Sequence, residues 1–108
     1  MEKNEKTIKY SKLFNLYGEL LTDSQKEIFT DYFFLDLSIS EISENKGISR
    51  AAVEDSLSKS IKKLDSYESS LGDLARNEKI LAKLEEIKGF ADKNEQIKLI
   101  EELMEEVK

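Results

Sequence analysis

The 108-residue chain contains no cysteine, histidine, tryptophan or proline. Without cysteine it can form no disulfide bond, thiolate nucleophile or sulfur-ligated metal site. Without histidine it lacks the imidazole on which many acid–base catalysts and zinc sites depend. Most hydrolytic and zinc-dependent chemistry is thereby excluded, and the four glycines are too scattered to form a phosphate-binding loop. We therefore expect a protein that is not an enzyme and that needs no metal or cofactor.

The shortage of turn residues favours an all-α fold. Strand-rich proteins need glycine, proline and other turn residues at short intervals, and here proline is absent and glycine occurs only four times. Hydrophobic residues make up 39% of the sequence and charged residues 37%. That balance suits one domain-sized chain with a real core.

Long apolar runs are missing as well. No stretch approaches the roughly 18 consecutive apolar residues of a membrane span. The first ten residues, MEKNEKTIKY, carry charges with no apolar run behind them, unlike a secretory signal. We expect a cytoplasmic protein with no membrane contact.

Apolar residues at three- and four-residue intervals predict two helices in the first third of the chain. The first buries one stripe, formed by Tyr10, Leu13, Phe14, Tyr17 and Leu21. The second begins at Thr22 or Asp23, either of which can cap a helix. Its predicted buried face consists of Ile28, Phe29, Tyr32, Phe33 and Leu35. We interpret these aromatic residues as core packing.

The segment from residue 40 to 57, SEISENKGISRAAVEDSL, has the pattern of a helix-turn-helix. A short helix begins at Ser38 or Ser40 and ends before Gly47, a residue free to adopt the left-handed conformation of a C-terminal cap. We expect Ile48 to fill the turn and Ser49 to cap the next helix. The predicted buried stripe of that helix is Val53, Leu57, Ile61 and Leu64.

A break at Ser69, Ser70 and Gly72 divides the chain into a helix-turn-helix domain, residues 1–71, and a helical C-terminal extension, residues 72–108. A second break is expected at Gly89 and residues 92–94. The two helices of the extension have apolar stripes that must be buried against another surface, either the first domain or a second chain. These stripes are Leu74, Leu81, Leu84 and Ile87, then Ile97, Ile100, Met104 and Val107.

Three motifs carry a resemblance to a known family: LTDSQKEIF, DLSISEI and GISRAAV, which start at Leu21, Asp36 and Gly47. They resemble the second DNA-binding region of bacterial sigma factors, and more closely the YlxM family, over about Tyr10 to Leu71. The resemblance implies a sigma-like helix-turn-helix domain. It also implies a link to the signal recognition particle, through its protein or its RNA, as an accessory or regulatory protein.

In a DNA-binding helix-turn-helix the second helix would present its exposed face to the major groove. The candidate nucleic-acid contacts are Ser49, Arg50, Ser58, Lys59, Lys62 and Lys63. Glu54 and Asp55 share that face and would be repelled by phosphate, and the net charge of −6 gives no general attraction to a duplex. We interpret the three lysines as a solvated face paired with Asp55, Asp65 and Glu68.

The last helix carries the second candidate surface. Adjacent glutamates point about 100° apart on a helix, so they are better suited to solubility or to a basic partner than to holding a metal. The candidate partner-binding residues are Glu101, Glu102, Glu105 and Glu106. The leading hypothesis is therefore a protein of the signal recognition particle pathway that acts by protein contact. A DNA-binding regulator that uses Arg50 and a dimerisation module are the alternatives.

Overall fold

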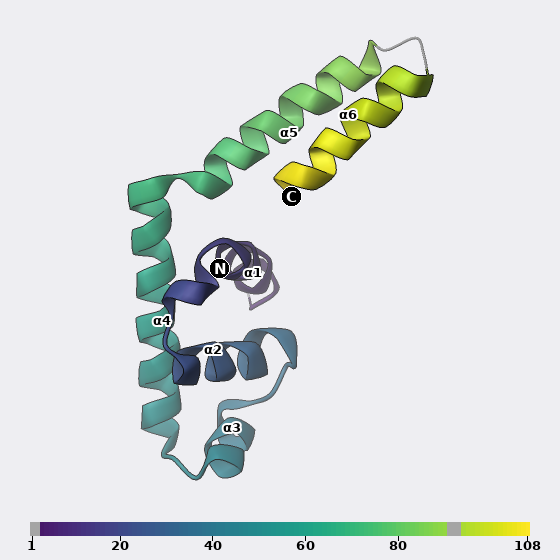
Figure 1. Ribbon diagram of the computed structural model, residues 1–108. Helices are drawn as coiled ribbons and strands as arrows, with labels where there is room; N and C mark the ends of the chain where they lie inside the picture. Colours follow the sequence, from purple (N-terminus) through teal and green to yellow (C-terminus); the bar gives the residue numbers. More distant parts are fainter. Residues whose placement is uncertain (1–2, 91–93) are drawn as a thin grey trace. The chain divides into compact units, whose positions relative to one another are not determined.

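The structure is a computed structural model that describes residues 3–90 and 94–108. Over these residues it is all-α, as predicted, with no strand (Figure 1). Its helices are α1 (Lys3–Tyr17), the 3-10 helix η1 (Gly18–Leu20), α2 (Asp23–Phe29), the π-helix η2 (Thr30–Phe34), α3 (Ile39–Lys46), α4 (Arg50–Leu71), α5 (Asp73–Gly89) and α6 (Asn94–Val107).

The helices form two compact units, Met1–Leu71 and Gly72–Lys108. In the first unit α4 packs against α1, α2 and α3. Its core is built from apolar side chains on all of these helices, and Leu13, Phe29, Ile42 and Val53 are almost completely buried.

The first helix is shorter than its apolar stripe predicts. It ends at Tyr17, and η1 carries the chain to Leu21, which is buried as expected although it lies outside α1. Gly18 permits this turn, because a Cβ atom there would lie 3.1 Å from the ring of Phe14. A larger residue would push against that ring, which is part of the core.

The second helix begins at Thr22, where the hydroxyl accepts from the backbone of Gln25 and the Gln25 side chain accepts in return. At Thr30 the helix changes to a π-helix, and the N–H of Leu35 donates to the carbonyl of Thr30. A π turn holds one residue more than an α turn, so it rotates the residues after it. This rotation explains why the prediction for Leu35 is wrong: its side chain is 61% exposed.

Contacts between aromatic rings hold α1 to the α2–η2 segment. Phe29 stacks on Phe14 with the ring centres 4.6 Å apart, and Phe33 lies at the same distance from Phe29. Tyr10 and Tyr32 pack against Phe33 from two sides. The interpretation of these residues as core packing is confirmed.

The fourth helix is continuous from Arg50 to Leu71, so the predicted break at Ser69 and Ser70 is wrong. Gly72 ends the helix in the left-handed conformation, with φ 65°. Val53, Leu57 and Leu64 are buried, while Ile61 is half-buried.

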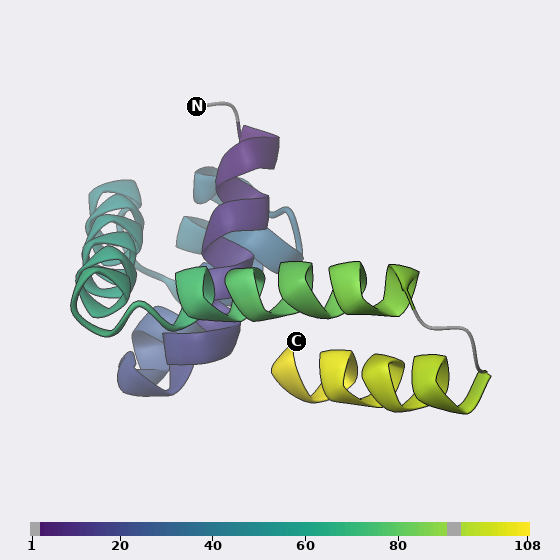
Figure 2. The same ribbon diagram turned by 90° about the horizontal axis from the view of Figure 1, so that it is seen from above.

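In the second unit α5 and α6 pack side by side as a hairpin (Figure 2). The two apolar stripes of the extension are therefore buried partly against each other, an arrangement that the sequence reading did not consider. Met104 is buried, but no residue of α5 is fully buried. Gly89 belongs to α5 and not to a break, and of the predicted break at 92–94 only Asn94, the first residue of α6, lies within the described residues.

Candidate functional site: the helix-turn-helix face

The turn between α3 and α4 is held by local hydrogen bonds. Gly47 adopts φ 66°, and its N–H donates to the carbonyl of Ser43. The N–H of Ile48 donates to the same carbonyl, while the hydroxyl of Ser43 donates to the carbonyl of Ile48. Ser43 thus fixes the turn from both directions, a role that its small size alone does not reveal.

Both flanking helices are anchored where the sequence predicts. The hydroxyl of Ser38 accepts from the N–H of Glu41 at 3.0 Å and begins α3. The hydroxyl of Ser49 accepts from the N–H of Ala52 at 3.0 Å and caps α4. Ile42 and Val53 are fully buried beneath the turn. Ile48, however, is 37% exposed and does not fill the turn, because backbone hydrogen bonds already close it.

The start of α4 is open to solvent. Ser49 and Arg50 are exposed, and so is Ser58 two turns further along. Glu54 and Asp55 are exposed on the same half of the helix. The exposed surface at the start of α4 is therefore mixed in charge, with two carboxylates close to the single arginine.

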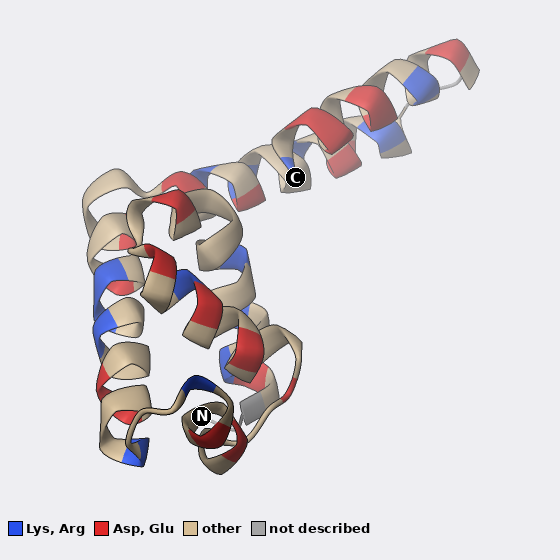
Figure 3. Ribbon diagram, turned by 60° about the horizontal axis from the view of Figure 1, so that its bottom comes forward, with Lys and Arg blue, Asp and Glu red and all other residues tan. Residues whose placement is uncertain are grey.

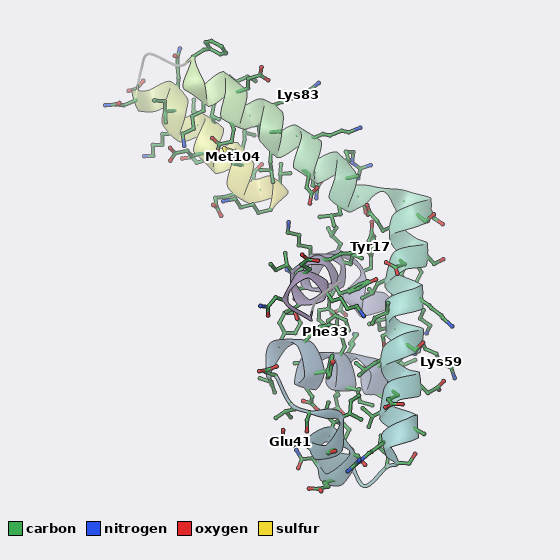
Figure 4. All side chains as sticks on the ribbon, turned by 180° about the vertical axis from the view of Figure 1, so that it is seen from behind. Tyr17, Phe33, Glu41, Lys59, Lys83 and Met104 are labelled. Atoms are coloured by element: carbon green, nitrogen blue, oxygen red, sulfur yellow. The ribbon has the colours of Figure 1, made fainter. Side chains whose placement is uncertain are left out.

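Lys59 is neutralised within the helix, because its Nζ lies 3.0 Å from the Asp55 carboxylate. Figure 3 shows basic and acidic segments alternating along α4, without a continuous basic stripe. Lys59 points away from the core in Figure 4. Its predicted pairing with Asp55 is confirmed.

Lys63 ties α4 to α2, since its Nζ donates to Oε1 of Gln25 at 3.1 Å. The same Gln25 oxygen accepts from the N–H of Thr22 in the cap of α2. This lysine is half-buried and has a structural role that the sequence spacing did not indicate. It is a poor candidate for phosphate contact, because binding would have to break this hydrogen bond.

The sequence interpretation expected Asp65 and Glu68 to pair with the lysines of α4, whereas the structure joins both carboxylates to α1. Asp65 accepts from the hydroxyl of Tyr10 at 3.0 Å and lies 3.8 Å from Lys9 Nζ. Glu68 accepts from the hydroxyl of Tyr17 at 2.8 Å. Burial raises the pKa of Tyr10, and the hydrogen bond to Asp65 adds to the effect. Both carboxylates therefore hold α1 against α4.

Lys62 lies at the edge of an apolar hollow formed by α1, η2, α3 and α4. The hollow has three charged residues, Lys6, Glu54 and Lys62, around an apolar surface. That apolar surface is formed by Tyr32, Phe33, Ile39, Leu57 and Ile61. The sequence could not show this hollow, because its lining comes from segments far apart in the chain. Its apolar character suits a protein side chain better than a phosphate.

The four glutamates of the last helix are all exposed, and they fall into two pairs. Glu101 lies 3.3 Å from Lys88 Nζ and Glu105 lies 3.0 Å from Lys108 Nζ, so both are engaged within the hairpin. Glu102 and Glu106 have no ion-pair partner within residues 3–90 and 94–108. These two are the carboxylates most available to a basic partner.

Two classes of feature are absent from the described residues. No group of three or more acidic, histidine or cysteine side chains could hold a metal ion there. No described helix is long and apolar enough to cross a membrane.

Comparison with known proteins agrees with this geometry. Residues 4–107 match the model of the UPF0122 family, described as "Putative helix-turn-helix protein, YlxM / p13 like". A UPF0122 protein of Thermoanaerobacter sp. (strain X514) is 39% identical over an alignment of 102 positions, which covers 88% of this chain and 87% of the relative. A UPF0122 protein of Mycoplasma capricolum is 49% identical over 80 residues, 74% of this chain and 70% of the relative. One from Halalkalibacterium halodurans is 36% identical over 89 residues, 82% of each chain.

Proposed function

Because the chain belongs to the UPF0122 family of YlxM/p13-like helix-turn-helix proteins, we propose that it is a non-enzymatic accessory protein of the signal recognition particle pathway, acting through protein contacts. The pathway is the one that the sequence resemblance implies. The mode of action, by protein contact, follows from the surface of the molecule.

One observation carries the proposal: most cations on the exposed part of α4 are paired within the chain or lie near carboxylates. Glu54 and Asp55 follow Arg50 by about one helical turn and are exposed like it, Lys59 is paired with Asp55, and Lys63 donates to Gln25. A protein gains affinity for a duplex by placing several unpaired cations against the phosphates. Of the candidate cations, Arg50 and Lys62 are left to contact phosphate. Two cations would give little attraction to a duplex, because the chain as a whole has a net charge of −6.

The acidic side of α6 supports a basic protein partner. Glu102 and Glu106 share one helix face at i, i+4 and are exposed. Proteins that bind RNA carry basic surfaces, so the protein of the particle would offer the complementary charge. Contact with the RNA of the particle, through Lys62 at the edge of the hollow, would be secondary to this protein contact.

The test compares two variants of the full chain for binding to the purified GTPase of the particle. One replaces Glu101, Glu102, Glu105 and Glu106 with Gln, and the other is Arg50→Glu. Loss of several interface charges should weaken binding roughly tenfold or more. We expect that loss for the four-glutamine variant and unchanged binding for Arg50→Glu. Equal binding by all three proteins, or none by the wild type, would contradict the proposal.

A DNA-binding regulator is the second candidate. Ser49 and Arg50 are exposed at the start of α4, where a helix-turn-helix protein contacts base edges. Arg50→Glu separates the candidates, because it should abolish binding by a DNA reader. A specific duplex complex lost in this variant would favour the regulator.

A further inference from the structure

One face of the α5–α6 hairpin exposes a row of apolar side chains. Ile80 and Ile87 belong to α5, Phe90 follows directly after α5, and Leu99 and Leu103 belong to α6. They range from 39% exposed at Ile80 to 81% at Phe90. Exposed apolar residues that gather on one face indicate a binding surface.

The exposed apolar residues of the two helices lie on the same side of the hairpin. Ile87 of α5 and Phe90, which follows α5, line one hollow together with Leu99 of α6. Charged side chains gather elsewhere on the hairpin, where Lys88 pairs with Glu101 and Lys108 pairs with Glu105. The hairpin is therefore two-sided, with a polar side closed by its own ion pairs and an apolar side left open.

The open side has opposite charges at its two edges. On α5, Lys83 follows Ile80 by three residues and precedes Ile87 by four, so it shares their stripe. In Figure 4 its side chain points away from α6. On α6, Glu106 follows Leu103 by three residues and is exposed. The α5 edge is thus basic and the α6 edge acidic.

We propose that this face binds the same face of a second copy of the chain, forming a four-helix bundle from two hairpins. The face is self-complementary: an apolar centre lies between a basic edge and an acidic edge. When one hairpin is turned over onto another about a two-fold axis parallel to the helices, α5 of each copy lies over α6 of the other. Each basic edge then meets an acidic edge.

The register within the hairpin identifies the charge pair. Lys88 Nζ lies 3.3 Å from Glu101 Oε1, so these two residues lie at about the same level of the antiparallel helices. Lys83 is five residues before Lys88 and Glu106 is five residues after Glu101, so in an antiparallel pair these two also share a level. A two-fold axis parallel to the helices preserves that level. Lys83 of one copy therefore meets Glu106 of the second copy, twice in the dimer.

The alternative axis, perpendicular to the helices, places α5 over α5 and α6 over α6. It would bring like charges together at both edges, which costs free energy and works against that arrangement. Charge complementarity thus selects the parallel axis. The inference concerns the chain alone, and Glu106 is the residue that it shares with the proposed function.

The experiment is sedimentation equilibrium of the full chain across about 1 to 200 µM, a range that resolves weak and strong dimers. We expect a dimer of twice the 12.4 kDa chain mass. Leu103→Glu should give a monomer of unchanged helicity by circular dichroism, since Leu103 is half exposed and its loss leaves the core intact.

The charge pair is tested by reversal. Lys83→Glu and Glu106→Lys should each weaken the dimer about tenfold, and the double variant should restore it to within roughly threefold of wild type. Lys98→Glu, the same charge change away from this face, is the matched control and should leave the dimer unchanged. A wild type that is monomeric throughout, a dimer unaffected by Leu103→Glu, or a double variant that fails to recover would overturn the proposal.

Discussion

Ser60 is fully buried in α4, and its hydroxyl has no hydrogen-bond partner within the described part of the chain. A buried hydroxyl without a partner costs about 1–3 kcal/mol of desolvation. We predict that Ser60→Ala raises the free energy of unfolding by about 1 kcal/mol in urea denaturation. Ser58→Ala, an exposed control on the same helix, should change it by less than about 0.5 kcal/mol. A loss of more than about 1 kcal/mol in Ser60→Ala would show that the hydroxyl has a partner.

The ion pair between α2 and α3 should be visible in a titration. Lys46 Nζ donates to Oε2 of Glu27 at 2.8 Å, and this hydrogen bond holds the pKa of Glu27 below its ordinary value of 4.5. When folding lowers the pKa of a carboxyl group, that group stabilises the fold at pH values above its pKa in the unfolded chain. The contribution is lost as the pH falls through the pKa of the group in the folded protein.

We therefore predict that carboxyl-carbon NMR gives Glu27 a pKa below 4.5, and that Lys46→Met moves it back toward that value. The shift should shrink at high salt, because the Glu27 side chain is 68% exposed. An unchanged Glu27 titration in Lys46→Met would contradict the assignment.

At the scale of elements, the turn of the helix-turn-helix depends on Gly47. Its φ of 66° is a left-handed conformation that costs a residue with a Cβ atom roughly 1–2 kcal/mol. We predict that Gly47→Ala lowers the free energy of unfolding by about 1 kcal/mol.

Gly89 supplies the control for that substitution. It belongs to α5, its φ is not positive, and a Cβ atom there would meet nothing within 4 Å. Gly89→Ala should therefore stabilise the hairpin by about 0.5–1 kcal/mol. Equal effects of the two substitutions in thermal and urea unfolding would refute this account of the turn.

The elements also show what sequence can predict. The caps at Thr22, Ser38 and Ser49 depend on a few neighbouring residues, so their chemistry is local and readable. The π-helix after Phe29 cannot be predicted in this way, because it depends on the packing of aromatic rings from separate helices. The exposure of Leu35 could not be predicted for that reason. The contact of Lys63 with Gln25 could not be predicted either, because the two residues are 38 positions apart.

At the scale of the whole molecule, the chain combines a helix-turn-helix unit with a helical hairpin. The helix-turn-helix could be predicted from the sequence, and so could the all-α fold, because the composition argues against strands. The hollow beside Lys62 and the open face of the hairpin could not, since each is assembled from separate segments. Both surfaces mix apolar residues with charge, which suits protein partners.

The most direct test of the central claim is fluorescence anisotropy of a labelled random-sequence duplex, titrated with the full chain at about 50 mM salt, where phosphate binding is strong. Our account predicts no saturable binding up to about 100 µM protein, weaker than ordinary non-specific DNA binding. Binding in the low micromolar range that falls steeply with added salt, and that disappears in Arg50→Glu, would show that α4 binds duplex DNA and would contradict the account.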